Sequence, residues 1–145
     1  MKIKSIHGFE VIDSRGNPTV GARVNLNDSI SGIAFVPSGA STGQHEANEK
    51  RDADENRYLG KGVLGAVESI EKEISPILEG KNVEDLLTND KLIIESDASP
   101  NKSNFGANAI LAVSLASAKA ASVSKNMPLY KFINEKSALD AKPTA

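Results

Sequence analysis

The chain begins with three short segments in which apolar and polar residues alternate. Residues 3–12, 19–26 and 30–36 place apolar side chains at every second position for most of their length, which is the period of a β-strand. The segments are separated by "DSRGNP" (13–18) and "NDS" (27–29), which carry the Asp, Asn, Gly and Pro residues that favour tight turns. Short turns between consecutive strands predict an antiparallel meander.

The rest of the chain has the period of helices. From Val63 to Ile77 apolar residues recur at steps of three and four. Further helices are predicted over 83–95 with Asn82 as the cap, over 106–124, and over 129–136. Because 106–124 is dominated by Ala and Ser, we expect its helix to pack very close to its neighbours. Strands followed by helices predict an α+β fold, a three-stranded antiparallel β-meander followed by about four α-helices.

Composition narrows the class of protein. A length of 145 residues, with 39% hydrophobic and 25% charged residues, suits one soluble domain. The net charge of −2 argues against a nucleic-acid-binding surface, and the absence of cysteine excludes disulfides and thiolate metal sites. The sequence starts without the apolar run of a signal peptide, and we expect that no stretch approaches the length needed to span a membrane. We therefore expect a cytoplasmic protein with no nucleic-acid and no membrane partner.

One small, polar loop invites a functional interpretation. The stretch "PSGASTGQHE" (37–46) is not a Walker A motif, because Gly39 and Gly43 are too close and no Lys-Ser or Lys-Thr follows. On spacing alone, the favoured interpretation is a surface connection. The alternative is a lid whose hydroxyls and bare amides reach an anion or a hydrated metal ion.

Other candidate motifs favour ordinary structural roles. "GKGVLG" (60–65) matches G-x-G-x-x-G, but the charged segment before it does not suit a buried strand, so we predict a loop and a helix start. His7 and His45 are the only histidines, and without a third ligand we expect surface or strand-end positions. The acidic run that follows is predicted to be solvated and ion-paired, and nothing indicates that Asp52 and Asp54 form an acid–base pair.

Several strings together resemble one family. "DSRGNPTV" (13–20), "PSGASTG" (37–43) and "RYLGKGV" (57–63) are similar to enolase, phosphopyruvate hydratase, in the same order and at the same spacing. "GANAILAVSLA" (106–116) and "PLYKF" (128–132) extend the resemblance. The resemblance implies that 1–137 is an enolase N-terminal capping domain and that 138–145 starts the linker to a C-terminal barrel. In this family the capping domain is itself a meander followed by helices, in agreement with the predicted fold.

The resemblance also implies an activity for the full-length protein. Enolases are glycolytic lyases that interconvert 2-phosphoglycerate and phosphoenolpyruvate plus water. They use two Mg²⁺ ions to stabilise the enolate that forms when a lysine removes the C2 proton, and a glutamate protonates the leaving hydroxide. A barrel of about 250 residues does not fit after Ala145, so the lysine, the glutamate and the first Mg²⁺ site are expected outside this sequence. Accordingly, no catalytic residue is expected here, and the chain alone is predicted to be inactive.

By the same resemblance, the polar loop closes over bound substrate. The predicted lid and substrate-binding residues are Ser38, Gly39, Ala40, Ser41, Thr42, Gly43 and His45. Ser41 is the expected ligand of the second Mg²⁺, since a hydroxyl oxygen suits a hard cation. Gly39 and Gly43 are the candidate hinges. The alternative function is a non-catalytic binding module derived from a capping domain.

The chain departs from the family pattern at a few positions. Many members carry Arg where this chain has Phe9, and Glu where it has Gly21. Both positions lie near the family's dimer contact, and the full-length protein is expected to be a dimer or a higher homo-oligomer. Ala53 replaces the glycine of the common "RDGD" string.

Overall fold

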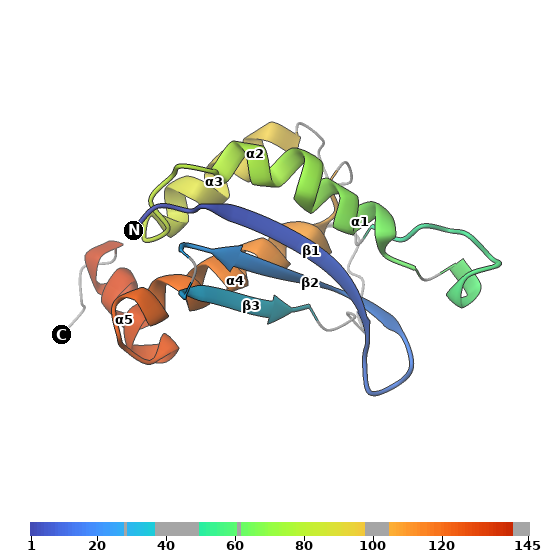
Figure 1. Ribbon diagram of the computed structural model, residues 1–145, viewed down its shortest axis with the longest axis horizontal. Coiled ribbons are helices and arrows are strands. Elements are labelled where there is room, and N and C mark those ends of the chain that lie inside the picture. Colours follow the sequence, from blue (N-terminus) through green and yellow to red (C-terminus); the bar gives the residue numbers. More distant parts are fainter. Residues whose placement is uncertain (28, 37–49, 61, 98–104, 141–145) are drawn as a thin grey trace.

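The predicted meander is present in the structure, a computed structural model that describes residues 1–27, 29–36, 50–60, 62–97 and 105–140. β1 (Ser5–Ile12), β2 (Pro18–Asn25) and β3 (Ser31–Phe35) form one antiparallel sheet in the order β1-β2-β3 (Figure 1). In this register Phe9 and Phe35 both pair with Gly21. The alternating pattern of the sequence therefore identified all three strands.

The helices follow the sheet, as the α+β prediction requires. The first helical run is one continuous rod made of α1 (Leu64–Ser69), a π-helical turn η2 (Ile70–Ile74) and α2 (Ser75–Leu78). It is followed by α3 (Leu86–Asp97), α4 (Ala107–Ser124) and α5 (Leu129–Asp140), and a short 3-10 turn, η1 (Tyr58–Gly60), precedes it. Val63, Ile70 and Ile74 are fully buried, which confirms the predicted apolar stripe.

The start of α3 and the end of α5 differ most from the prediction, and the other helix ends lie within two residues of it. α3 begins at Leu86 rather than Val83, because Asn82 closes a turn before the helix instead of capping it. The Glu84 N–H donates to Asn82 Oδ1 at 3.1 Å, and the Val83 N–H donates to the Met1 carbonyl at 3.0 Å. α5 continues to Asp140, past the predicted end at residue 136.

One face of the sheet is covered by helices. α4 packs on β2 and β3, and the α1–α2 rod packs on β1 (Figure 1). A Cβ added at Gly32 would lie 2.3 Å from the Ala120 nitrogen and 2.4 Å from the Ala116 carbonyl oxygen. The backbones of β3 and α4 therefore touch, which confirms that the Ala- and Ser-rich helix packs very close. By length and composition alone α4 could cross a membrane, contrary to the expectation that no stretch approaches that length, and 56% of the helix is buried inside the protein.

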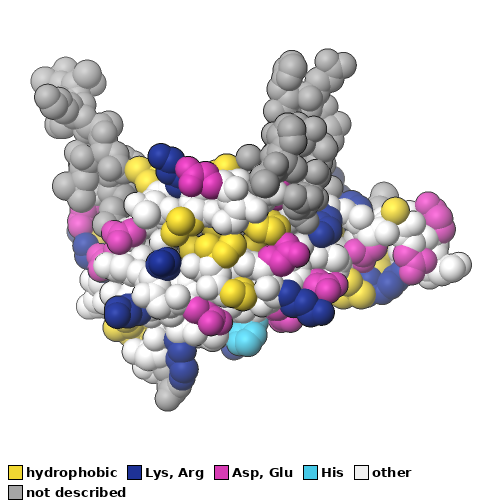
Figure 2. Space-filling model, turned by 90° about the horizontal axis from the view of Figure 1, so that it is seen from above, with side chains coloured by type: hydrophobic (Ala, Val, Ile, Leu, Met, Phe, Trp, Pro, Cys, Tyr) yellow, Lys and Arg dark blue, Asp and Glu magenta, His cyan; other side chains and the backbone are white. Residues whose placement is uncertain are grey.

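The outward face of the rod is polar. Glu68, Glu71, Lys72 and Glu73 are all exposed there, and Lys72 Nζ pairs with Glu68 Oε1 at 3.0 Å. Figure 2 views the molecule from this side and shows acidic and basic side chains mixed around a central group of hydrophobic side chains. This mixture is typical of a solvated face.

Candidate functional site

The predicted lid residues 38–45, with the metal ligand Ser41 among them, lie outside the described residues. The structure does describe the residues on either side, Val36 and Lys50. The candidate site therefore consists of Val36 and Lys50, on either side of segment 37–49, and of the elements that hold them.

The upstream end is fixed to β2. Val36 is 4% exposed, and its N–H donates to the Val20 carbonyl at 3.0 Å. The Thr19 hydroxyl donates to the Val36 carbonyl oxygen, and Thr19 is itself buried. Both polar backbone groups of Val36 are thus paired, so the chain leaves the sheet from a defined position.

The downstream end is held by α4 and by β2. The Lys50 N–H donates to Asn108 Oδ1 at 2.9 Å, and Asn108 Nδ2 donates to the Lys50 carbonyl at 3.1 Å. Arg51 Nη1 donates to the Pro18 carbonyl at 2.7 Å. Val36 is thus bonded to the start of β2, whereas Lys50 is bonded to the start of α4 and the Arg51 side chain reaches across to Pro18 of β2.

Asp52 joins this region to the first helix. Its carboxylate accepts the Leu64 and Gly65 N–H groups at 2.9 and 2.8 Å, and these are donors that the first turn of α1 leaves unpaired. The Asp54 carboxylate accepts a hydrogen bond from the backbone N–H of Asn56, two residues later, at 3.0 Å. Both carboxylates therefore have structural partners, and residues 50–60 form turns rather than the buried strand that a dinucleotide site needs.

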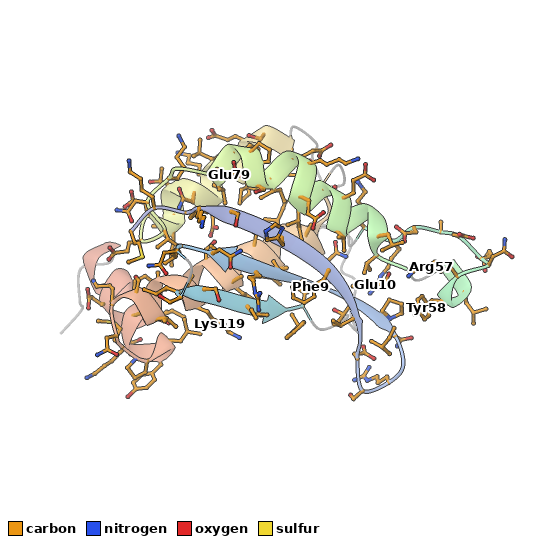
Figure 3. All side chains as sticks on the ribbon, in the orientation of Figure 1. Phe9, Glu10, Arg57, Tyr58, Glu79 and Lys119 are labelled. Carbon is orange, nitrogen blue, oxygen red and sulfur yellow. The ribbon has the colours of Figure 1, made fainter. Side chains whose placement is uncertain are left out.

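An ion pair ties the same region to β1. Arg57 Nη1 donates to Glu10 Oε2 at 2.9 Å, Arg57 Nη2 binds Glu10 Oε1, and the Val63 N–H donates to Glu10 Oε2 at 2.9 Å. Figure 3 shows Glu10 and Arg57 together near the end of the sheet, with Tyr58 beside them. The Arg57 hydrogen bond, helped by the Val63 N–H and opposed by burial, lowers the pKa of the Glu10 carboxyl.

The described residues do not form a metal site by themselves. Within the described ranges, no group of three or more His, Cys, Asp or Glu side chains is close enough to hold an ion. His7 is exposed on β1, which agrees with the expected surface position. The Mg²⁺ that the resemblance implies thus has no complete set of ligands among these residues.

Sequence reasoning missed the side chains that hold Val36 and residues 50–60 to the sheet and to α4. Asn108, Thr19, Glu10 and Arg57 were not singled out, although Asn108 carried a usable signal. It is a polar residue in an otherwise small and apolar helical stretch, and a buried amide requires hydrogen-bond partners. The sequence did not indicate that the partner is the backbone of Lys50, which is distant along the chain.

The comparison with known families agrees with this geometry. The model of the family described as "Enolase, N-terminal domain" matches residues 3–133. The match includes the three strands, the α1–α2 rod, α3, α4 and the first residues of α5. Because it extends over nearly the whole chain, the chain belongs to the enolase N-terminal domain family.

Proposed function

We propose that this domain is the capping domain of a glycolytic enolase and supplies its active-site lid. Membership of the family supports the proposal, and one observation carries it. The residues on both sides of segment 37–49 are held by the core, Val36 by Thr19 of β2, Lys50 by Asn108 of α4, and Arg51 by Pro18 of β2. A rigid base of this kind suits a loop that must open and close over a ligand while its ends stay in place.

In this proposal, residues 38–45 cover 2-phosphoglycerate or phosphoenolpyruvate when the lid closes. Ser41 offers one hydroxyl oxygen to Mg²⁺, and the remaining ligands come from a barrel outside residues 1–145. When bound, Mg²⁺ would stabilise the negative charge that develops on the substrate. The base and the acid also belong to the barrel. The role left to the capping domain is to bind and orient the substrate and to exclude water from the site.

Membership of the family also suggests the compartment, the oligomeric state and the domain boundaries of the full-length protein. We place the full-length enzyme in the cytoplasm, as a homodimer or higher homo-oligomer, with residues 1–137 as the capping domain and 138–145 as the start of the linker. The helix α5 continues through the proposed boundary to Asp140.

Domain complementation tests the proposal. Purified residues 1–145, a separately expressed enolase barrel, and their mixture are each supplied with Mg²⁺ and 2-phosphoglycerate, and phosphoenolpyruvate formation is followed. We expect no turnover from the chain alone and restored turnover in the mixture, with the barrel alone as the control. Turnover by residues 1–145 alone would overturn the proposal that the catalytic groups lie in the barrel. Binding of the two domains without any turnover would favour the alternative, a non-catalytic binding module.

A further inference from the structure

The outer edge of β1 is closed by the helical rod. The Ile6 N–H donates to Ser75 Oγ at 3.2 Å, and the Gly8 N–H donates to Glu71 Oε1 at 3.3 Å. Alternate residues of a strand turn their polar groups to opposite sides, and these two N–H groups point away from β2. An added strand would bind the same groups. Side chains of the rod therefore occupy the place of a neighbouring strand along this edge.

The outer edge of β3 has no such cover from the described residues. The Val36 N–H donates to the Val20 carbonyl, so every second residue before Val36 also turns its polar groups toward β2. The residues between them, Ser31, Ile33 and Phe35, turn their N–H and carbonyl groups outward. Within the described part of the chain, no hydrogen bond involves these outward groups. They form a row of donors and acceptors that another strand can bind.

The composition of β3 does not oppose pairing. The strand Ser31–Phe35 contains no charged residue and no proline, the residues with which natural edge strands prevent such contacts. Ile33 is half-buried and Phe35 is 50% exposed, and both lie on the face of the sheet that the helices leave open. A strand added at this edge would therefore find apolar side chains on that face as well as backbone partners.

On the opposite face, the same edge is bordered by α4. A Cβ added at Gly32 would lie 2.4 Å from the Ala116 carbonyl oxygen and 2.3 Å from the Ala120 nitrogen, so this turn of α4 touches β3. Lys119 is exposed on the same turn, and Figure 3 shows it beside β3 on the side away from β2. Its ammonium group has no ion-pair partner among the described residues. Leu115, one turn earlier, is also exposed.

We propose that the outer edge of β3 binds an extended segment of a partner protein, with an acidic residue between apolar residues on the side that faces α4. The backbones of Ser31, Ile33 and Phe35 supply the hydrogen bonds, as in other complexes formed by strand addition. Lys119 selects for the acidic residue by charge complementarity. A second copy of the chain suits the edge less well, because pairing β3 with itself would bring two Lys119 side chains to one edge. This interaction is separate from the enolase reaction.

The probe is a synthetic peptide with blocked ends, Thr-Val-Thr-Glu-Thr-Val-Thr. Its sequence is palindromic, so both directions of pairing present the same order of side chains. A second peptide has Lys in place of Glu. A third has the first sequence but carries N-methyl groups on its backbone nitrogens, which removes its hydrogen-bond donors and leaves its charge unchanged.

The protein is the natural polypeptide that contains these residues, as wild type, Lys119→Glu and Lys91→Glu. Lys91 is exposed on α3, so its replacement makes the same change in net charge away from β3. Peptide affinities are measured by titration at low salt, where charge pairs are least screened. We expect wild type to bind the Glu peptide about three- to tenfold more tightly than the Lys peptide, and Lys119→Glu to reverse this preference. Lys91→Glu should keep the wild-type preference.

Amide hydrogen exchange, resolved to single residues, shows which groups bind the peptide. In the complex with the Glu peptide, the Ile33 and Phe35 amides should exchange about tenfold more slowly, as after the gain of an ordinary hydrogen bond. The Ala34 amide, which already faces β2, should change much less. Binding to the surface of α4 alone would not produce this alternation. The N-methylated peptide should not bind.

Several results would overturn the proposal. These are no binding of the Glu peptide, equal binding of the N-methylated peptide, or an unchanged preference in Lys119→Glu. Without peptide, protection of the Ile33 and Phe35 amides that grows with protein concentration would identify a second copy as the occupant. Protection that is present at every protein concentration would mean that another part of the polypeptide covers the edge. Either pattern would exclude an acidic partner strand.

Discussion

The ring of Phe9 lies edge-on to the ring of Phe35, with centroids 5.5 Å apart and planes at 74°, across the strand that separates them. Gly21 occupies the position between the two rings on β2. A Cβ at Gly21 would lie 2.4 Å from Phe9 Cε2 and 2.9 Å from Phe35 Cδ1. The side chains of Phe9 and Phe35 therefore close over a position on β2 that has no side chain of its own.

We expect Gly21→Ala to destabilise the protein by about 1–3 kcal/mol, because the new methyl group must push the rings apart. The measurement is the free energy of unfolding in urea. In a Phe9→Leu background the smaller side chain should leave room for the methyl group, and the same substitution should then cost much less. An equal cost in both backgrounds would show that the two residues act independently.

At Gly32 the obstacle is backbone rather than a side chain. An added Cβ would meet the Ala120 nitrogen and the Ala116 carbonyl oxygen of α4, and neither can turn away as a ring can. Gly32→Ala should therefore cost about 3 kcal/mol or more and separate β3 from α4. Thermal unfolding and hydrogen exchange of the α4 amides check this. A loss smaller than that of Gly21→Ala would contradict the argument.

Ala53 has φ +60°, a left-handed conformation that costs a residue with a Cβ about 1–2 kcal/mol. Ala53→Gly, which restores the family's common glycine, should stabilise the protein by about 0.5–1 kcal/mol, after the greater freedom of glycine in the unfolded chain is subtracted. Ala118→Gly inside α4 is the control, and there the sign should reverse, with a loss of about 1 kcal/mol. Chemical denaturation of the two variants measures both changes.

The Glu10 carboxyl has its pKa lowered in the folded protein, chiefly by the hydrogen bond from Arg57. The unfolded chain, with an ordinary glutamate pKa of about 4.3, therefore takes up the proton first as the pH falls. The stability that Glu10 contributes is complete above that pH and is lost as the pH falls through the folded-state pKa. We expect Glu10→Gln to lower neutral-pH stability by less than about 1 kcal/mol, because solvent screens part of the pair.

The control for the Glu10 prediction is the way in which the free energy of unfolding varies with pH. Unfolding free energies are compared between wild type and Glu10→Gln from neutral to acidic pH. The two curves should converge below the folded-state pKa of Glu10, because the wild-type carboxyl is then neutral as well. Parallel curves over the whole range would mean that Glu10 does not contribute through its charge.

Ser41→Ala in the full-length enzyme tests the proposed metal ligand. The substitution removes one oxygen and leaves the backbone of the loop unchanged. Binding of the second Mg²⁺, measured by calorimetry in the presence of substrate, should weaken, and kcat should fall more than substrate affinity. Ser29→Ala, at an exposed serine between β2 and β3, is the control and should retain the wild-type turnover. Wild-type Mg²⁺ dependence in Ser41→Ala would show that the assignment is wrong.

The sequence by itself determined the class of fold and the family. The alternation of Val20, Ala22 and Val24 predicted β2, and the spacing of Val63, Ile70 and Ile74 predicted the rod, because burial on one face leaves a periodic pattern in the chain. The strings around Asp13 and Gly106 carried the resemblance that the family model then confirmed. These signals are local, so they can be read without knowing which elements touch.

Only the tertiary structure decided which distant residues act together. The residues next to Asn108 in the chain do not indicate that it holds Lys50. In the same way, the local sequence does not indicate that Asp52 binds the first turn of α1, or that Gly21 is flanked by Phe9 and Phe35. The start of α3 was likewise decided by a contact, because Val83 bonds to the N-terminal residue instead of joining the helix. Such pairings depend on how separate elements pack, and packing brings together groups whose separation along the chain leaves no periodic trace.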